Sequence, residues 1–323
     1  MQSFEWVEAR SVEEAAALLA ATTRDKPVVA KAGGMDLLDL MKEGIVQPAR
    51  VVNLRSITSL GGVHVDDRGM RLGALVTLAE IARDPSISKH YRALAEAAQH
   101  AATPQVRNAA TLGGNLLQRP RCWYFRNEHF HKISQADHSE HQYHAIFDNR
   151  QTAMVHASTP ATALVAYDAS VHLTLAGGSS RFVPLAEFLL PPSMTRDRDT
   201  VIADGEVLTH ISVPAPPPNA RVAYHKQTER DSYDWPTCDV AVLLRMDGNV
   251  IAEARIVMGW VAPTPRRATE SERMLVGREL NESTAAEAAR AAVSGATPLA
   301  KNVYKVRVLE TVVRRKLLAA ASH

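Results

Sequence analysis

The chain lacks most features that mark membrane-spanning, disulfide-stabilised or nucleic-acid-binding proteins. It has only two cysteines, too few for a disulfide framework or for a metal site built from cysteine alone. No apolar run approaches membrane-spanning length, and the N-terminus lacks the basic and apolar regions of a signal peptide. The net charge of +2 gives no argument for nucleic acid or an anionic membrane as a partner. We therefore expect a cytoplasmic globular protein, although export alongside a signal-bearing partner subunit would leave no trace in this sequence.

Two Gly-Gly steps about eighty residues apart are the most informative motifs that the chain does contain. Glycine pairs adopt torsions closed to other residues and let bare N–H groups approach a ligand. Such amides bind a pyrophosphate without requiring a formal positive charge. Neither motif is a Rossmann G-x-G-x-x-G or a P-loop. The pair predicts a two-loop clamp around a dinucleotide, formed by Ala30-Lys31-Ala32-Gly33-Gly34-Met35-Asp36-Leu37 and Ala110-Thr111-Leu112-Gly113-Gly114-Asn115.

The first sixty residues predict a small parallel sheet. Ser11 and Glu14 form a capping box that begins a helix running to about residue 22. A strand over 28–32, a short helix over 36–43 and a strand over 51–54 follow. This order places the Gly33-Gly34 turn at the carboxyl end of a strand, where ligands of open α/β sheets usually bind.

The remaining pattern predicts an α+β fold. Short strands over 63–65, 70–75, 170–175 and 207–213, with helices beginning at Thr77 and covering 91–102, indicate an antiparallel sheet. The proline-rich stretch 214–218 reads as a linker. Strands near 221–226, 241–246 and 251–258 then precede helices near 266–276, 284–294 and 303–321. We predict one domain over 1–216, with subdomains 1–57 and 58–216, and a second over 220–323 with an antiparallel sheet and a helical bundle. Gly61-Gly62 and Gly177-Gly178 are predicted to be hairpin turns.

With these motifs in order, the chain resembles the FAD-binding subunit of molybdenum hydroxylases, the xanthine dehydrogenase and carbon monoxide dehydrogenase family. The resemblance runs almost end to end. It rests on four stretches, residues 32–38 with Met41-Lys42, 106–116, 258–268 and 304–307.

The resemblance implies which residues hold FAD. Residues 30–37 would wrap the pyrophosphate and ribose, and the second motif, with Ala110, Thr111, Gly113, Gly114, Asn115 and Gln118, would hold the phosphates from the other side. Lys226 matches a family lysine near the flavin, and Trp235 falls on a loop that covers the isoalloxazine face in relatives. Thr159 stands where the family has an acidic residue. FAD would be bound non-covalently, since neither loop contains a histidine or cysteine.

An insertion over 118–157 resembles that of aldehyde-oxidising and hydroxybenzoyl-CoA-reductase-like members, where further cysteines bind an extra iron–sulfur cluster. Here only Cys122 remains, and Lys132 stands where a second ligand is expected. Because a cubane cluster normally requires four thiolates, we predict the insertion without its cluster and assign no metal site. The insertion is rich in histidine, which favours a polar surface loop whose imidazoles are solvated or contact a partner; a divalent-metal site is the alternative for His129, His131, His138, His141 and His144.

The function implied by the resemblance is electron transfer. Substrate would be oxidised at a molybdenum cofactor on a large subunit, and electrons would pass through a small two-cluster iron–sulfur subunit to FAD on this chain and then to an external acceptor. No catalytic side chain is predicted, since the chemistry belongs to the cofactor. The alternatives are a stand-alone flavin oxidase or dehydrogenase, a non-catalytic scaffold that has lost its flavin, and a histidine-rich metal-binding module.

Overall fold

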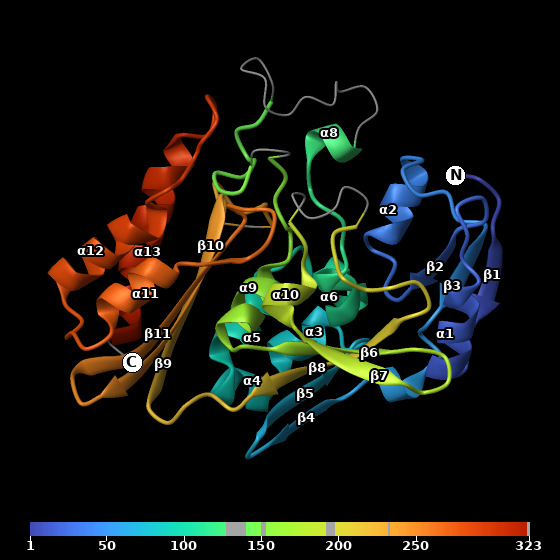
Figure 1. Ribbon diagram of the computed structural model, residues 1–323, viewed down its shortest axis with the longest axis horizontal. Coiled ribbons are helices and arrows are strands. Elements are labelled where there is room, and N and C mark those ends of the chain that lie inside the picture. The colour runs from blue at the N-terminus through green and yellow to red at the C-terminus, as the bar shows by residue number, and fades with distance from the viewer. Residues whose placement is uncertain (127–139, 150–152, 192–197, 232, 322–323) are drawn as a thin grey trace.

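The computed structural model describes residues 1–126, 140–149, 153–191, 198–231 and 233–321. Three sheets follow one another along the long axis, with helices packed against them (Figure 1). The first sheet is parallel and the other two are antiparallel, which confirms the predicted α+β class. Among the helices of these residues, none combines the length and hydrophobicity that crossing a bilayer requires.

The N-terminal region contains the three-stranded parallel sheet. Its strand order is β1-β3-β2. Ser11 Oγ accepts from the Glu14 amide at 3.1 Å and so caps the first helix as predicted. The capping box is not complete, because the Glu14 carboxylate accepts from the Arg10 amide, at 2.8 Å, and not from the Ser11 amide. The chain leaves β2 through Gly33-Gly34 at its carboxyl end, as predicted. The elements are β1 (Glu5–Glu8), α1 (Val12–Ala20), β2 (Val28–Lys31), α2 (Leu37–Lys42) and β3 (Arg50–Asn53).

The middle region combines a five-stranded antiparallel sheet, in the order β4-β5-β8-β6-β7, with a group of short helices on one of its faces (Figure 1). Its strands are β4 (Val63–Asp66), β5 (Gly69–Gly73), β6 (Ser170–Thr174), β7 (Ser180–Pro184) and β8 (Val207–Pro214). Its helices are η1 (Thr58–Leu60), α3 (Leu78–Arg83), α4 (Pro85–His90), α5 (Arg92–Gln99), α6 (Pro104–Ala109), α7 (Leu112–Leu116), α8 (Trp123–Arg126), α9 (Thr159–Ala166) and α10 (Leu185–Phe188).

The C-terminal region is a four-stranded antiparallel sheet, in the order β12-β11-β10-β9, followed by three helices. Both faces of β10 are buried, which explains its continuous apolar run. Leu243 joins the core that includes α5 and α9, whereas Val242 faces the core that includes the last helices. The elements are β9 (Ala220–Gln227), β10 (Cys238–Asp247), β11 (Val250–Gly259), β12 (Arg266–Arg267), α11 (Thr269–Leu275), α12 (Glu282–Val293) and α13 (Tyr304–Ala321).

A buried polar group joins this sheet to the middle region. Asp239 is fully buried on β10, where its carboxylate accepts from the Tyr224 hydroxyl at 2.8 Å and from Thr162 Oγ1 of α9 at 3.1 Å. Burial raises the pKa of Asp239 to about 7. Gly259 is required beside it, because a Cβ there would lie 1.9 Å from the carboxylate.

Several sequence-based expectations were wrong in detail. Strand β1 was not predicted, because its sequence EWVE is largely exposed and has no apolar alternation. Strand β7 was also missed, although the Gly177-Gly178 hairpin that precedes it is confirmed. Gly61-Gly62 is not a hairpin turn but connects η1 to β4. The helix expected from residue 266 begins only at Thr269, since Arg266 and Arg267 pair with β11.

Candidate functional site

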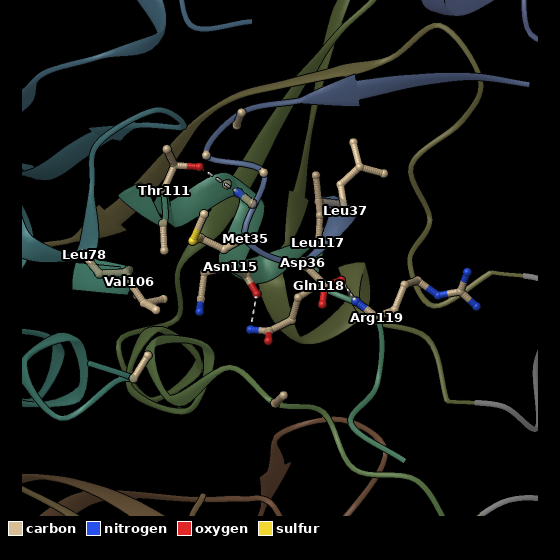
Figure 2. Close-up of a pocket in the computed structure, with 18 of the residues that line it drawn as sticks. Met35, Asp36, Leu37, Leu78, Val106, Thr111, Asn115, Leu117, Gln118 and Arg119 are labelled. Atoms are coloured by element: carbon tan, nitrogen blue, oxygen red, sulfur yellow. Dashed lines mark hydrogen bonds between the residues drawn. The ribbon is translucent and has the colours of Figure 1, made fainter. Parts of the chain in front are cut away.

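A cavity of about 610 Å³ lies where the parallel sheet, the five-stranded sheet and the loop 228–236 meet. This volume is typical of a small-molecule or cofactor site. Figure 2 shows part of its lining, with Met35, Thr111 and Asn115 labelled. Every site residue predicted from the sequence lines this one cavity, namely Ala30, Lys31, Ala32, Gly33, Gly34, Met35, Asp36, Leu37, Ala110, Thr111, Gly113, Gly114, Asn115, Gln118, Thr159, Lys226 and Trp235.

The two glycine motifs are in direct contact. A Cβ built on Gly33 would lie 2.0 Å from the Ala109 carbonyl oxygen, so only glycine allows the first loop to approach the second this closely. Gly34 adopts a φ of +79°, which favours glycine as well. The two glycine loops, which are distant in sequence, therefore lie side by side in the folded chain, as expected.

The first motif presents a series of free main-chain donors. The amides of Gly33, Gly34, Met35 and Asp36 donate to no acceptor in the described part of the chain. Consecutive unpaired N–H groups at the wall of a cavity form a concave anion-binding surface. This arrangement suits a phosphate or diphosphate group.

The second motif differs from the sequence-based picture. Most of it folds into the short helix α7, and five of its amides, including those of Ala110 and Leu112, already donate within the protein. The Gly113 amide donates to the Ala74 carbonyl at 2.9 Å, and those of Gly114 and Asn115 donate to Thr111 at 3.2 and 2.8 Å. Gly113 also packs tightly, since a Cβ there would lie 2.9 Å from Ala74 Cβ. The main contribution of this motif is thus close packing rather than free amides: Ala110 packs against Gly33 of the first loop, and Gly113 packs against Ala74.

Polar side chains extend the wall beyond α7. Gln118 Nε2 donates to the Asn115 carbonyl at 2.7 Å (Figure 2). Asn115 Oδ1 accepts a hydrogen bond from Ser158 Oγ. Thr159 lies in the wall but is buried, and its hydroxyl donates to the Ala97 carbonyl at 3.1 Å. These bonds fix the positions of the side chains before any ligand binds.

An ion-pair network that sequence reasoning missed surrounds the first motif. Asp36 accepts from the Arg119 amide at 2.9 Å and pairs with Arg121 at 3.1 Å and Arg126 at 2.7 Å. Both guanidinium groups also reach Asp39, at 3.2 and 3.0 Å. The insertion is thereby attached to the start of α2. The one sign of this ion-pair network in the sequence is the group of three arginines within residues 119–126. Their spacing does not indicate which acidic residues they pair with.

Lys226 and Trp235 form the C-terminal lip of the cavity. Lys226 Nζ donates to the carbonyls of His100 at 2.8 Å and Asp234 at 2.6 Å, so it attaches the 228–236 loop to the end of α5. Burial lowers the pKa of Lys226. The Trp235 ring is 53% exposed and lies 5.2 Å from the buried Trp260 ring. An exposed ring at this position can cover whatever occupies the cavity.

Two of the five candidate histidines of the insertion, His141 and His144, lie among the described residues and are not the solvated groups that we favoured. His141 and His144 are buried, and His144 Nε2 lies 3.2 Å from the Cys122 sulfur. Burial lowers the pKa of His144 to about 4 and raises that of Cys122, so both groups stay neutral near neutral pH. Lys305 of α13 holds this segment by donating to the His144 and Trp260 carbonyls. The described residues include no group of three or more metal-binding side chains, while His129, His131, Lys132 and His138 lie outside them.

The wall combines apolar side chains, free amides and aromatic rings. Apolar side chains from α1, β2 and the segment after β3, such as Leu19, Val29 and Leu54, line the N-terminal side. The free amides of the first motif and the aromatic lip line the same cavity. The lining therefore offers apolar surface for one ring, donors for a diphosphate and aromatic surface for the other ring.

The chain is similar to subunits of known oxidoreductases. The chain is 30% identical to the aldehyde oxidoreductase FAD-binding subunit PaoB of Escherichia coli, over 90% of each chain. It is 29% identical to the carbon monoxide dehydrogenase medium chain of Hydrogenophaga pseudoflava, over 98% of this chain and 96% of that one. A solved structure of carbon monoxide dehydrogenase from that organism superposes with a TM-score of 0.78 at 28% identity, covering 99% of this chain and 98% of the other.

Two family descriptions match nearly the whole chain. Residues 2–216 match the FAD binding domain in molybdopterin dehydrogenase, and residues 223–320 match the CO dehydrogenase flavoprotein C-terminal domain. The resemblance noted from the sequence is confirmed. The chain therefore belongs to the FAD-binding medium subunits of the molybdenum hydroxylase family, as an oxidoreductase subunit with FAD as its cofactor.

Proposed function

We propose that this chain is the electron-transfer subunit of a molybdenum-dependent hydroxylase or aldehyde oxidoreductase. It would receive electrons from the iron–sulfur clusters of a small partner subunit, after substrate oxidation at a molybdenum cofactor on a large subunit. It would then pass them to an external acceptor. The observation that carries the proposal is the meeting of both glycine motifs at one cavity whose wall holds a series of free amides.

The first motif would bind the diphosphate. The free amides of residues 33–36 are the donors, and oxygen atoms of a diphosphate are the acceptors that such a surface favours. The side chains around them would contact the adjoining ribose and ribityl groups. The second motif would lie on the other side of the diphosphate. Its polar side chains there would be Asn115 and, just after it, Gln118. Ala30, Lys31, Ala32 and Leu37, with Ala110, Thr111, Gly113 and Gly114, would complete this part of the wall.

The lip would control access to the isoalloxazine ring. Trp235 would cover one face of the ring and limit the approach of dioxygen or a pyridine nucleotide. Lys226 would hold the loop that carries Trp235 in place through its two carbonyl contacts. Thr159 would contribute a neutral wall where relatives have an acidic residue.

FAD supplies the chemistry of reversible electron acceptance and release, and the chain supplies binding, orientation and control of access. None of the proposed site residues has to act as a nucleophile or general base. This division of labour agrees with a cavity wall made mostly of apolar side chains and main-chain groups.

The domain division and the cellular location stay predictions. A boundary between residues 216 and 220 is supported by the gap between the two family matches, at residues 217–222. The cytoplasmic location rests on the sequence arguments alone.

The proposed function can be tested on the complex purified from its host by a tag on this chain. We expect flavin absorbance, a smaller co-purifying subunit that contains iron, and a larger one that contains molybdenum. Substrate turnover by this chain alone would instead favour a stand-alone flavin enzyme. A colourless, flavin-free preparation would favour the scaffold interpretation.

A further inference from the structure

Two acidic side chains lie in the wall of the cavity beside the free amides of the first motif. Asp36 is the last residue of that series of amides, and Asp39 follows three residues later in α2. A diphosphate is an anion, so carboxylates at this place oppose its binding unless their charge is compensated. The proposed FAD site therefore needs a source of positive charge close to the start of α2.

The insertion provides this charge. Arg126 pairs with Asp36 at 2.7 Å and with Asp39 at 3.0 Å, and Arg121 pairs with the same two carboxylates at 3.1 and 3.2 Å. The side chains of Arg126 and Asp36 are only 13% and 16% exposed, so water screens their interaction incompletely. Two carboxylates and two guanidinium groups sum to no net charge, and the cluster as a whole does not repel an anion.

The other cations near this cluster are engaged elsewhere. Lys31, in the first motif, directs its Nζ to the Asn53 side chain at 3.4 Å. Arg119 donates its main-chain amide to Asp36 at 2.9 Å, while its guanidinium group pairs with Asp199. The described residues thus place the compensating charge on the two later arginines of the insertion rather than in the motif itself.

We propose that the insertion is an electrostatic part of the FAD site, in which Arg121 and Arg126 neutralise Asp36 and Asp39 so that the neighbouring amides can bind a diphosphate. This inference rests on the proposed function. Both arginines act through the two carboxylates, and neither has to touch the cofactor. The local charge, rather than the number of contacts in the cluster, then determines how strongly FAD binds.

Asp39→Asn separates an effect of charge from an effect of structure. The substitution removes both ion pairs of Asp39, so FAD binding would weaken if the cluster only held the cavity wall in shape. It also leaves one surplus positive charge beside the diphosphate. We therefore expect FAD to bind more tightly, by roughly two- to fivefold, because the Asp39 side chain is 46% exposed and its charge is partly screened.

Arg126→Gln tests the opposite sign. It leaves one surplus negative charge, and FAD should bind roughly tenfold more weakly. The double variant Arg126→Gln/Asp39→Asn restores the charge balance although it loses more contacts than either single variant, and it should bind FAD within threefold of wild type. Arg92→Gln is the matched control for a lost arginine, because Arg92 pairs with Glu96 at 2.7 Å outside the cavity wall and should leave the affinity unchanged.

The dissociation constant of FAD is measured by titrating the apoprotein of each full-length variant at low and at high salt. Circular dichroism and thermal unfolding without FAD check that the variants fold. The differences between variants should shrink at high salt, because salt screens a charge but does not repair a distorted wall. If Arg126→Gln does not fold, Arg121→Gln and its double variant with Asp39→Asn take its place.

The inference is overturned if Asp39→Asn fails to tighten FAD binding, or if the double variant binds FAD as weakly as Arg126→Gln. Differences that do not depend on salt would also contradict it. A wild-type chain that binds no FAD would instead refute the proposed function itself.

Discussion

Replacement of Gly33 by alanine tests the contact between the two glycine motifs. The added Cβ would lie 2.0 Å from the Ala109 carbonyl oxygen, below the 3.0 Å that real Cβ contacts respect. The two loops must therefore move apart by about 1 Å. The atoms that clash with the added Cβ belong to the backbone, so no flexible side chain can move aside instead. Overpacking of this kind costs about 1–3 kcal/mol. For a chain of this size, that corresponds to a fall of roughly 1.5–4.5 °C in the melting temperature.

The same displacement moves the free amides away from the second motif, so we expect FAD binding to weaken at least roughly tenfold. The assays are thermal unfolding of the apoprotein and titration with FAD. Gly61→Ala is the matched control, because Gly61 also belongs to a Gly-Gly step but its Cβ would meet only Thr58 O at 3.4 Å. If Gly33→Ala binds FAD and unfolds as Gly61→Ala does, the close contact of the loops is not what forms the site.

Three further predictions concern the lip and the buried acid. Trp235→Ala should speed reoxidation of the reduced flavin by dioxygen several-fold in stopped-flow measurements, because the ring that covers the cavity is lost. The control is Trp123→Ala, which removes a ring that is 51% exposed but lies outside the cavity wall and should leave the reoxidation rate unchanged. Equal reoxidation rates for the two variants would contradict the shielding role of Trp235. Lys226→Met should free the 228–236 loop, weakening FAD binding and speeding reoxidation together, whereas the exposed Lys42→Met should change neither. Asp239→Asn should change how stability depends on pH, because burial raises the pKa of the native carboxyl from 3.8 to about 7.

The sign of the Asp239 effect follows from proton linkage. Between pH 4 and 7 the unfolded chain has an ionised Asp239 while the native chain keeps it protonated, so stability falls as the pH rises. Relative to Asp239→Asn, wild type should lose up to about 4 kcal/mol over this range, at about 1.4 kcal/mol per pH unit, and the difference should level off above about pH 7. Urea unfolding at several pH values measures it. A difference between the two proteins that does not vary with pH would show that the native carboxyl is ionised throughout.

The parts of the fold that were predictable are those with strong local signals. The Ser11 helix cap, the apolar strand β2 and the glycine turn after it identified the N-terminal parallel sheet. β1 and β7 were missed because one is an exposed edge strand and the other has an exposed outer face, so neither shows the alternation of a half-buried strand.

The residues that line the cavity were predictable from the sequence, but the hydrogen bonds and ion pairs that these residues make were not. Both motifs were recognised by their residues, yet the sequence does not show that the amides of Gly113 and Gly114 are used by Ala74 and Thr111. These bonds depend on where α7 packs, which is a matter of tertiary structure. The same holds for the ion pairs of Arg121 and Arg126, whose partners lie more than eighty residues earlier in the chain. His144 was expected in solvent because polar composition alone says nothing of the Cys122 contact that burial allows.

An experimental structure of the FAD-loaded protein tests the central claim most directly. The account predicts that the diphosphate oxygens lie within hydrogen-bonding distance of the amides of Gly33 and Gly34, with the second motif on the opposite side. A flavin nucleotide whose diphosphate lies elsewhere, or glycine motifs that are separated in the loaded protein, would contradict it.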